Sequence, residues 1–181
     1  SPWGSNYTFV VKLRLDAASE CKAVYKPRSG EMPLWDFPEG TLYKREVAAY
    51  LLSCFLGWDF IPPTVVREGP HGVGSLQQFV EHDPRSTYFS LRDAHRAELE
   101  MIACFDLLAN NADRKASHCF LGYDGRVWGI DHGLTFNAVF KLRTVIWDFS
   151  GQEISKPLVS DLLQVREALL KPGREVRGFL A

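Results

Sequence analysis

Two stretches of sequence decide the fold, NNADRKASH at residues 110–118 and GIDHG at residues 129–133. Each is polar and directly follows an apolar segment, a helical pattern before the first and a short strand pattern before the second. Asp131 precedes a glycine at the end of that strand, a position that suits a hard divalent cation bound through carboxylate oxygen. Asp113 can orient a hydroxyl nucleophile, and Lys115 can stabilise charge that develops on a phosphoryl group. Together they predict a site for phosphate chemistry.

A third stretch, AVYKP at residues 23–27, places Lys26 at the end of a predicted strand. A lysine on a strand can neutralise phosphate oxygens, but its long side chain needs a carboxylate that holds it in place. Glu46 is the only acid in the next predicted helix. We therefore expect Lys26 and Glu46 to form an ion pair near the phosphate site.

The remaining elements follow from hydrophobic periodicity. The first half predicts strands at 7–15, 21–25, 64–67 and 75–80, with one helix over 41–55 that Thr41 caps. The second half predicts helices over 90–108 and 156–170 and a hairpin at 119–122 and 127–130. The apolar face of the first helix is expected at Val47, Tyr50, Leu51, Cys54 and Phe55, and that of the second at Leu99, Ile102, Phe105 and Leu108.

Length and composition restrict the class of protein. A chain of 181 residues is long enough for a buried core in one domain. The formal net charge of −1 gives no support for nucleic-acid binding, since a general polyanion binder is expected to be basic. Apolar runs fall far short of the roughly 20 residues of a membrane span, and the polar start is not a signal peptide. Four cysteines without C-x-x-C spacing favour reduced thiols and a cytoplasmic location.

The order of strand lysine, helix glutamate, D-R loop and D-x-G resembles the protein-kinase-like superfamily. The D-R and I-D-H-G motifs are most similar to its phosphatidylinositol 3-/4-kinase branch, including small bacterial members, and the resemblance covers roughly residues 4–133. It implies an α+β, compact two-lobed kinase-like fold. The strand-rich N-lobe would span residues 1–80 and the mainly helical C-lobe residues 81–181, with ATP bound between them.

The resemblance also implies a role for each motif residue. Lys26 matches the lysine that contacts the α- and β-phosphates of ATP, and Glu46 matches its ion-pair partner. Asp113 matches the aspartate of the catalytic loop, with Lys115 two residues later as a second catalytic group. Asp131 matches the metal-binding aspartate of the D-x-G motif.

Two further segments match parts of the nucleotide site. The loop that covers the phosphates corresponds to Gly4, Ser5 and Asn6. The hinge between lobes corresponds to residues 77–81, where backbone groups of Phe79 and Val80 would lie near adenine. In the family a strand precedes the phosphate loop, and Gly4 leaves almost no room for it. A chain truncated at its start would explain this.

One position departs from the family pattern. The residue five positions after the catalytic aspartate is His118, where the family has an asparagine that binds a second metal ion. Imidazole is a poor ligand for Mg²⁺ and a better one for softer ions. We expect Asp131 and His118 to bind a divalent cation, Mg²⁺ or Mn²⁺. The alternative is a buried histidine that donates to a backbone carbonyl.

The expected activity is transfer of the γ-phosphoryl group of ATP to a hydroxyl of a lipid, protein or small molecule. The sequence does not select among these acceptors. Two alternatives stay open: a nucleotide-binding pseudokinase that acts through partners, and nucleotidyl transfer on the same fold. A zinc site made of Cys104, His118, Cys119 and His132 is a weaker alternative, because their spacing matches no ordinary zinc site.

Overall fold

The chain forms an α+β fold in the computed structural model, which describes residues 6–14 and 20–171. Its main sheet has four antiparallel strands in the order β1-β2-β4-β3. A short antiparallel hairpin, β5 with β6, forms a second sheet. The predicted α+β class is therefore confirmed. The strands are β1 (Phe9–Arg14), β2 (Glu20–Pro27), β3 (Thr64–Gly69), β4 (Gly72–Gln78), β5 (Cys119–Leu121) and β6 (Val127–Gly129).

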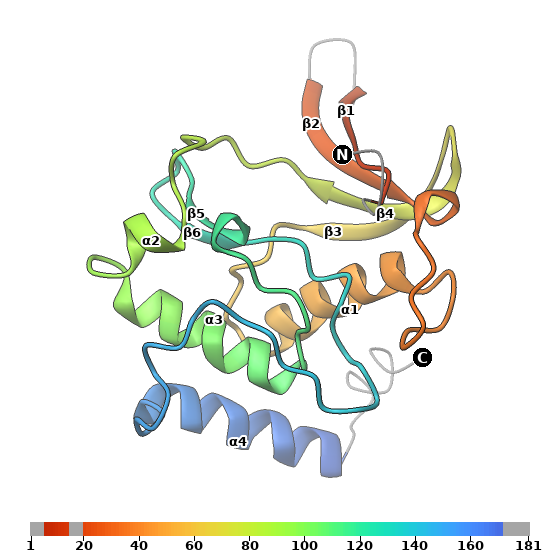
Figure 1. Cartoon of the computed structure of the whole chain (residues 1–181). Coiled ribbons are helices and arrows are strands. Elements are labelled where there is room, and N and C mark those ends of the chain that lie inside the picture. The colour runs from red at the N-terminus through yellow and green to blue at the C-terminus, as the bar shows by residue number, and fades with distance from the viewer. Residues whose placement is uncertain (1–5, 15–19, 172–181) are drawn as a thin grey trace.

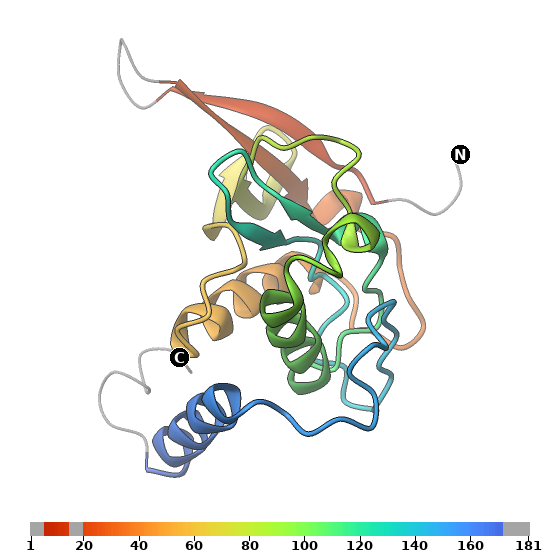
Figure 2. The ribbon, with the colours of Figure 1, turned by 90° about the vertical axis from the view of Figure 1, so that its left-hand side faces the viewer.

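The helices lie on one side of the main sheet. Both views show the sheet at one end of the molecule, α4 at the other end, and α1 and α3 between them (Figures 1 and 2). This arrangement covers α1 from more than one direction. The helices are α1 (Leu42–Phe55), α2 (Tyr88–Leu91), α3 (Arg96–Leu108) and α4 (Lys156–Leu170), with 3-10 turns at Arg28–Gly30 and Ala116–His118.

The alternation of side chains along β2 decides where Lys26 points. Successive residues of a strand face opposite sides of the sheet. Ala23 and Tyr25 are buried in a small cluster with Leu76 of β4. Val24 and Lys26 therefore share the other face, where both line a cavity.

The predicted apolar face of α1 is wrong about the most buried positions, although Tyr50 and Phe55 of that face do pack against the main core. The most buried positions of α1 are Leu42, Tyr43, Glu46, Ala49 and Ser53, whereas the five apolar residues expected there are half-buried. Hydrophobic periodicity identifies one stripe of a helix that packs on one surface. Because α1 packs between the sheet and the remaining helices, its polar positions are covered as well.

The N-terminus of α1 is capped from a distant loop. Thr41 does not bond to the first helical amides, and its Oγ1 donates to Pro38 O at 2.7 Å instead. The carboxylate of Glu31 accepts hydrogen bonds from the backbone amides of Leu42 at 3.1 Å and Tyr43 at 2.8 Å. A negative charge here also complements the positive end of the helix dipole.

The single helix predicted over residues 90–108 is also wrong, because the chain forms α2 and α3 with a turn between them. His95, at the start of α3, has φ −122° and ψ 43°, outside the helical region. The amides of Ala94 and His95 both bond to Leu91 O, which closes α2. Of the predicted stripe, Leu99, Ile102 and Phe105 are buried and Leu108 is exposed.

The main core lies beneath α1 and is built around α3. The rings of Phe60 and Phe105 pack edge to face at 5.1 Å, and α4 joins this core through Leu158 and Val165. The indole of Trp58 donates to Asp161 on α4 at 2.9 Å. None of the helices in the described residues has both the length and the hydrophobicity that a membrane crossing requires.

Candidate functional site

A cavity of about 530 Å³ brings together the candidate residues from both halves of the chain. One wall comes from β2, β4 and α1, and the other from the segments 113–118 and 130–134. Ser5 lies outside the described residues. The predicted site residues that line this one cavity are Asn6, Lys26, Glu46, Phe79, Val80, Asp113, Lys115, His118 and Asp131.

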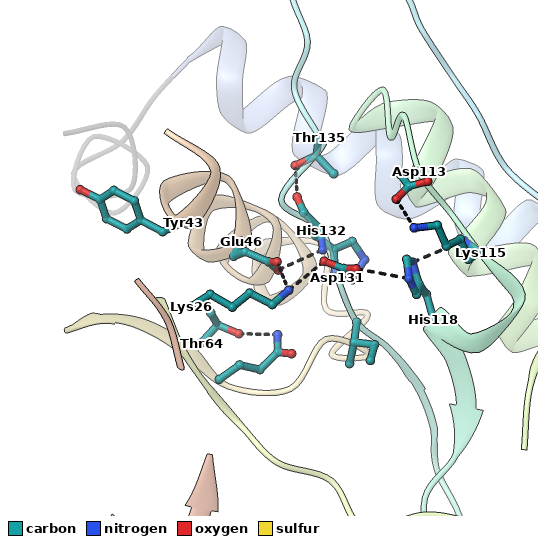
Figure 3. Close-up of polar contacts among 12 residues, drawn as sticks. Lys26, Tyr43, Glu46, Thr64, Asp113, Lys115, His118, Asp131, His132 and Thr135 are labelled. Atoms are coloured by element: carbon teal, nitrogen blue, oxygen red, sulfur yellow. Dashed lines mark hydrogen bonds and ion pairs between the residues drawn. The ribbon is translucent and has the colours of Figure 1, made fainter. Parts of the chain in front are cut away.

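Lys26 joins two acids that are distant in sequence. Its Nζ lies 2.5 Å from Glu46 Oε1 on α1 and 2.8 Å from Asp131 Oδ1 after β6 (Figure 3). Burial alone would lower the pKa of Lys26, but the two carboxylates raise it above its usual value. Burial opposes the charge of Asp131 in turn, and Lys26 still lowers the pKa of Asp131 to about 2. Lys26 and Asp131 are therefore charged at neutral pH.

Helix α1 also holds the segment that follows Asp131. Glu46 Oε2 accepts a hydrogen bond from the backbone amide of His132 at 2.9 Å. The neighbouring Arg45 donates through Nη1 to the carbonyls of Thr135 at 2.6 Å and Phe136 at 2.8 Å. Asp131 has φ 62°, a left-handed conformation that costs free energy for a residue other than glycine. The contacts of α1 offset that cost and fix the direction of the Asp131 side chain.

His118 lies beside Asp131, with Nε2 at 3.3 Å from Oδ2 (Figure 3). Its other ring nitrogen, Nδ1, accepts from the backbone amide of Lys115 at 3.4 Å. The ring proton is therefore on Nε2, the nitrogen that lies beside the Asp131 carboxylate. Burial lowers the pKa of His118 despite the neighbouring carboxylate, so the ring is neutral at neutral pH. Among the described residues Nδ1 contacts a backbone amide and Nε2 lies beside a carboxylate, so the expected donation to a backbone carbonyl is not observed.

Asp113 and Lys115 form an ion pair of 2.8 Å at the more open side of the cavity. The backbone amide of Asp113 donates to Asn111 Oδ1 at 3.1 Å, which fixes the loop at this point. Lys115 is 60% exposed at its side chain, and its hydrogen bond to Asp113 raises its pKa. A carboxylate and an ammonium group thus face the solvent side of the same cavity.

Sequence reasoning missed a buried network beneath these residues. Arg114 donates to both carboxylate oxygens of Asp106 on α3, at 2.8 and 2.7 Å, and to Ile130 O at 3.1 Å. Its Nη2 also lies 2.7 Å from His132 Nε2. Asn111 donates to the same Asp106 carboxylate at 2.8 Å. This network ties α3 to both functional stretches, and the acid within the apolar stretch ACFDLL was the signal that could have revealed it.

The donor groups on the cavity wall fit a cation that arrives with phosphates. No cluster of three or more His, Cys, Asp or Glu side chains able to bind a metal occurs in residues 6–14 and 20–171, which contradicts the zinc alternative. Mg²⁺ commonly takes one or two protein carboxylates and completes its shell with water and substrate phosphates. Asp131 meets that need as an ionised carboxylate. His118 would have to move its proton to Nδ1 before Nε2 could bind a metal.

Phe79 and Val80, which the resemblance assigns to a hinge, line the same cavity. The amide of Phe79 donates to Lys22 O at 3.1 Å, and the carbonyl of Val80 accepts from His82 Nδ1 at 2.9 Å. His82 stacks on Phe120 with ring centroids 3.8 Å apart. The hydrogen bonds engage two of the backbone groups expected near a base, and the side chains of Phe79, Val80 and Phe120 make this end of the cavity apolar.

Comparison with known proteins places the chain in a family. Protein Rv2133c from Mycobacterium tuberculosis is 39% identical over 203 aligned residues, which cover 93% of this chain and 73% of that protein. The chain belongs to the family of Protein Rv2133c. Phosphatidylinositol 4-kinase gamma 4 from Oryza sativa subsp. japonica is 35% identical over 128 residues, or 60% of this chain and 22% of the plant protein. No model of a protein family matches the chain. A partial similarity thus links this member of the Rv2133c family to a protein named as a kinase.

Proposed function

We propose that this protein is an ATP-dependent phosphotransferase with a compact two-lobed kinase-like fold, divided near residue 80. The observation that carries the proposal is the meeting of Lys26, Glu46 and Asp131 on one cavity, with Asp113 and Lys115 beside them. These residues come from segments that are far apart in the sequence, Lys26 and Asp131 being separated by 105 positions. The partial similarity to the plant kinase supports the same direction.

The cluster of Lys26, Glu46 and Asp131 suits the phosphates of a nucleotide. The buried Glu46 carboxylate fixes the position of the Lys26 ammonium group at the cavity wall, which both residues line. Lys26 would then bind phosphate oxygens, and Asp131 would hold a divalent cation. The cation supplies charge neutralisation on the phosphates when it is bound.

Asp113 and Lys115 suit the transfer itself. Asp113 would accept the proton of the acceptor hydroxyl while the acceptor oxygen forms its bond to the γ-phosphorus. The bond from the γ-phosphorus to the bridging oxygen breaks, and ADP leaves with that electron pair. Lys115 Nζ, held 2.8 Å from Asp113, would stabilise negative charge on the transferred group.

Transfer of label from ATP labelled at the γ or at the α position tests the proposal. The protein is incubated with each label, Mg²⁺ or Mn²⁺, and lipid, protein and small-molecule acceptors, with self-phosphorylation measured in parallel. We expect γ-label on a product, loss of that label in Asp113→Asn, and its retention in Asp93→Asn, whose side chain is 99% exposed. Label from the α position would show nucleotidyl transfer instead.

A nucleotide-binding pseudokinase is the second candidate, and the position of His118 favours it. The ring lies beside Asp131 with its proton on Nε2, where the family pattern has a metal-binding asparagine. Binding without transfer would identify this function. A ligand at 100 Kd stabilises the native state by about 2.7 kcal/mol, so ATP with a cation should raise the melting temperature. If millimolar ATP gives no rise with either ion, the nucleotide proposal fails in both forms.

A further inference from the structure

Gln77 on β4 is a polar side chain inside the apolar end of the cavity. It is only 6% exposed and lies opposite Val24 of β2 and Thr64 of β3 in the sheet. Ser75, two residues earlier on the same face, lies opposite Lys26. Two residues of a strand span about 7 Å, so Gln77 lies about that far along the sheet from the phosphate-binding end.

The orientation of the Gln77 amide follows from hydrogen bonding. Thr64 Oγ1 donates its single proton to Pro62 O at 2.7 Å. It can therefore only accept from Gln77, and Nε2 lies 2.8 Å away. The amide nitrogen is thus held against Thr64, and the carbonyl oxygen, Oε1, is directed elsewhere.

The Oε1 atom of Gln77 retains contact with the cavity. In the described part of the chain, only Ser53 Oγ and His132 Nδ1 are buried side-chain atoms that lack a partner. No hydrogen-bond donor of the described residues reaches Gln77 Oε1, so this oxygen is not sealed inside the protein. The cavity, which Gln77 lines, supplies that contact.

The surroundings make this oxygen a selective group. The neighbouring cavity wall is formed by apolar side chains of Val24, Phe79, Phe120 and Ile130, which suit the faces of a planar base. An acceptor fixed in such a wall favours a ligand that brings a donor and disfavours one that leaves the oxygen unpaired.

We propose that Gln77 Oε1 accepts a hydrogen bond from the exocyclic amino group of adenine, and that Thr64 holds the amide in the orientation this requires. The proposal rests on the proposed nucleotide site and deepens it by naming a side chain that selects the base. The amino group at position 6 is a donor in adenine, is replaced by a carbonyl in hypoxanthine and is absent in unsubstituted purine.

Binding of three nucleotides tests the proposal directly. Dissociation constants are measured with Mg²⁺ for ATP, inosine triphosphate and purine riboside triphosphate, which lacks only the amino group. We expect ATP to bind the wild type about tenfold more tightly than the other two, as for one lost hydrogen bond. Equal affinities for ATP and purine riboside triphosphate would overturn the proposal.

Variants assign the preference to the residue. Gln77→Met, which keeps the length and removes the oxygen, should bind all three nucleotides alike. Thr64→Val, which removes the hydrogen bond that orients the Gln77 amide, should reduce the preference for ATP over the other two nucleotides. The control Gln164→Met, on the exposed side of α4, should leave that preference unchanged. A preference for ATP that persists in Gln77→Met overturns the proposal. If no nucleotide binds the wild type, the proposed function fails instead, so the two failures are distinct.

Discussion

Two charged clusters lie next to each other in this protein, and they differ in what surrounds them. The cavity cluster of Lys26, Glu46 and Asp131 leaves 22% of the Lys26 side chain and 46% of the Asp131 side chain exposed. The core cluster of Arg114 and Asp106 is fully covered, with both side chains at 0%. An ion pair that borders a cavity can exchange a partner for a ligand, whereas a sealed pair can only hold the backbone. The partly exposed cluster is therefore the one that can bind a ligand, and the covered cluster is the one that can position the backbone.

Burial also makes the core cluster the more costly one to disturb. Arg114 donates hydrogen bonds to both carboxylate oxygens of Asp106 and to two backbone carbonyls. The Asp106 carboxylate balances the buried positive charge of Arg114. Burial lowers the pKa of His132 well below its usual value, and the neighbouring Arg114 guanidinium lowers it further. The core cluster therefore works only as a complete network.

The largest expected effect is the loss of stability when this network is broken. Arg114→Met leaves the Asp106 carboxylate buried without its partner and should lower the free energy of unfolding by about 3–5 kcal/mol. Urea unfolding followed by fluorescence measures it. Arg143→Met, at an exposed position one residue before Thr144, should change the value by less than about 0.5 kcal/mol. Similar effects in both variants would contradict the division between the two clusters.

The next effect separates chemistry from binding within the cavity. Asp113→Asn should reduce turnover about a hundredfold, the effect of losing a general base, with little change in the affinity for ATP. Lys26→Met should weaken both, because in the proposed function Lys26 would contact the phosphates before and during transfer. Calorimetric binding and initial rates give the two quantities. Equal losses of affinity in both variants would show that Asp113 has a structural role.

A smaller effect is expected at Glu31, which lines the cavity and also caps the N-terminus of α1. Its carboxylate binds the first amides of α1, so Glu31→Ala should lower the free energy of unfolding by about 1 kcal/mol. Glu39→Ala, on the same loop and exposed, serves as the matched control. An equal cost at both positions would mean that the cap contributes nothing measurable.

The smallest expected effect is at His118. Because Nε2 carries the ring proton and so has no free lone pair for a metal, His118→Asn should leave the ratio of activities with Mg²⁺ and Mn²⁺ unchanged within about twofold, less than one lost hydrogen bond would produce. Initial rates at saturating ATP with each ion measure the ratio. A shift of the Asn variant toward Mg²⁺ would instead identify His118 as a metal ligand.

Local patterns predicted the elements well where one side of an element is covered. The hairpin at β5 and β6 and the limits of α4 agree with their sequence patterns, and Leu99, Ile102 and Phe105 lie on the buried stripe of α3. The face of α1 could not be read in this way, because the sheet and the helices bury it from several directions.

The cavity residues were predictable for a different reason, since each stands in a short motif with a distinct chemistry. The ion pair of Lys26 with Glu46 is present as expected. The network around Arg114 was missed because its members alternate with cavity residues, Arg114 lying between Asp113 and Lys115. Neighbours along a loop point to opposite sides, and only the folded backbone shows which of them face the core.

The hydrogen bonds between α1 and the segment after Asp131 also affect how these two parts of the chain open to solvent. Glu46 and Arg45 lie on one helical turn and bind residues 132, 135 and 136, while Glu46 also binds Lys26. A movement of α1 relative to residues 132–136 would break all of these bonds at once. The helix and the segment therefore move as one rigid body, and slow hydrogen exchange at the His132 amide should match that of the centre of α1.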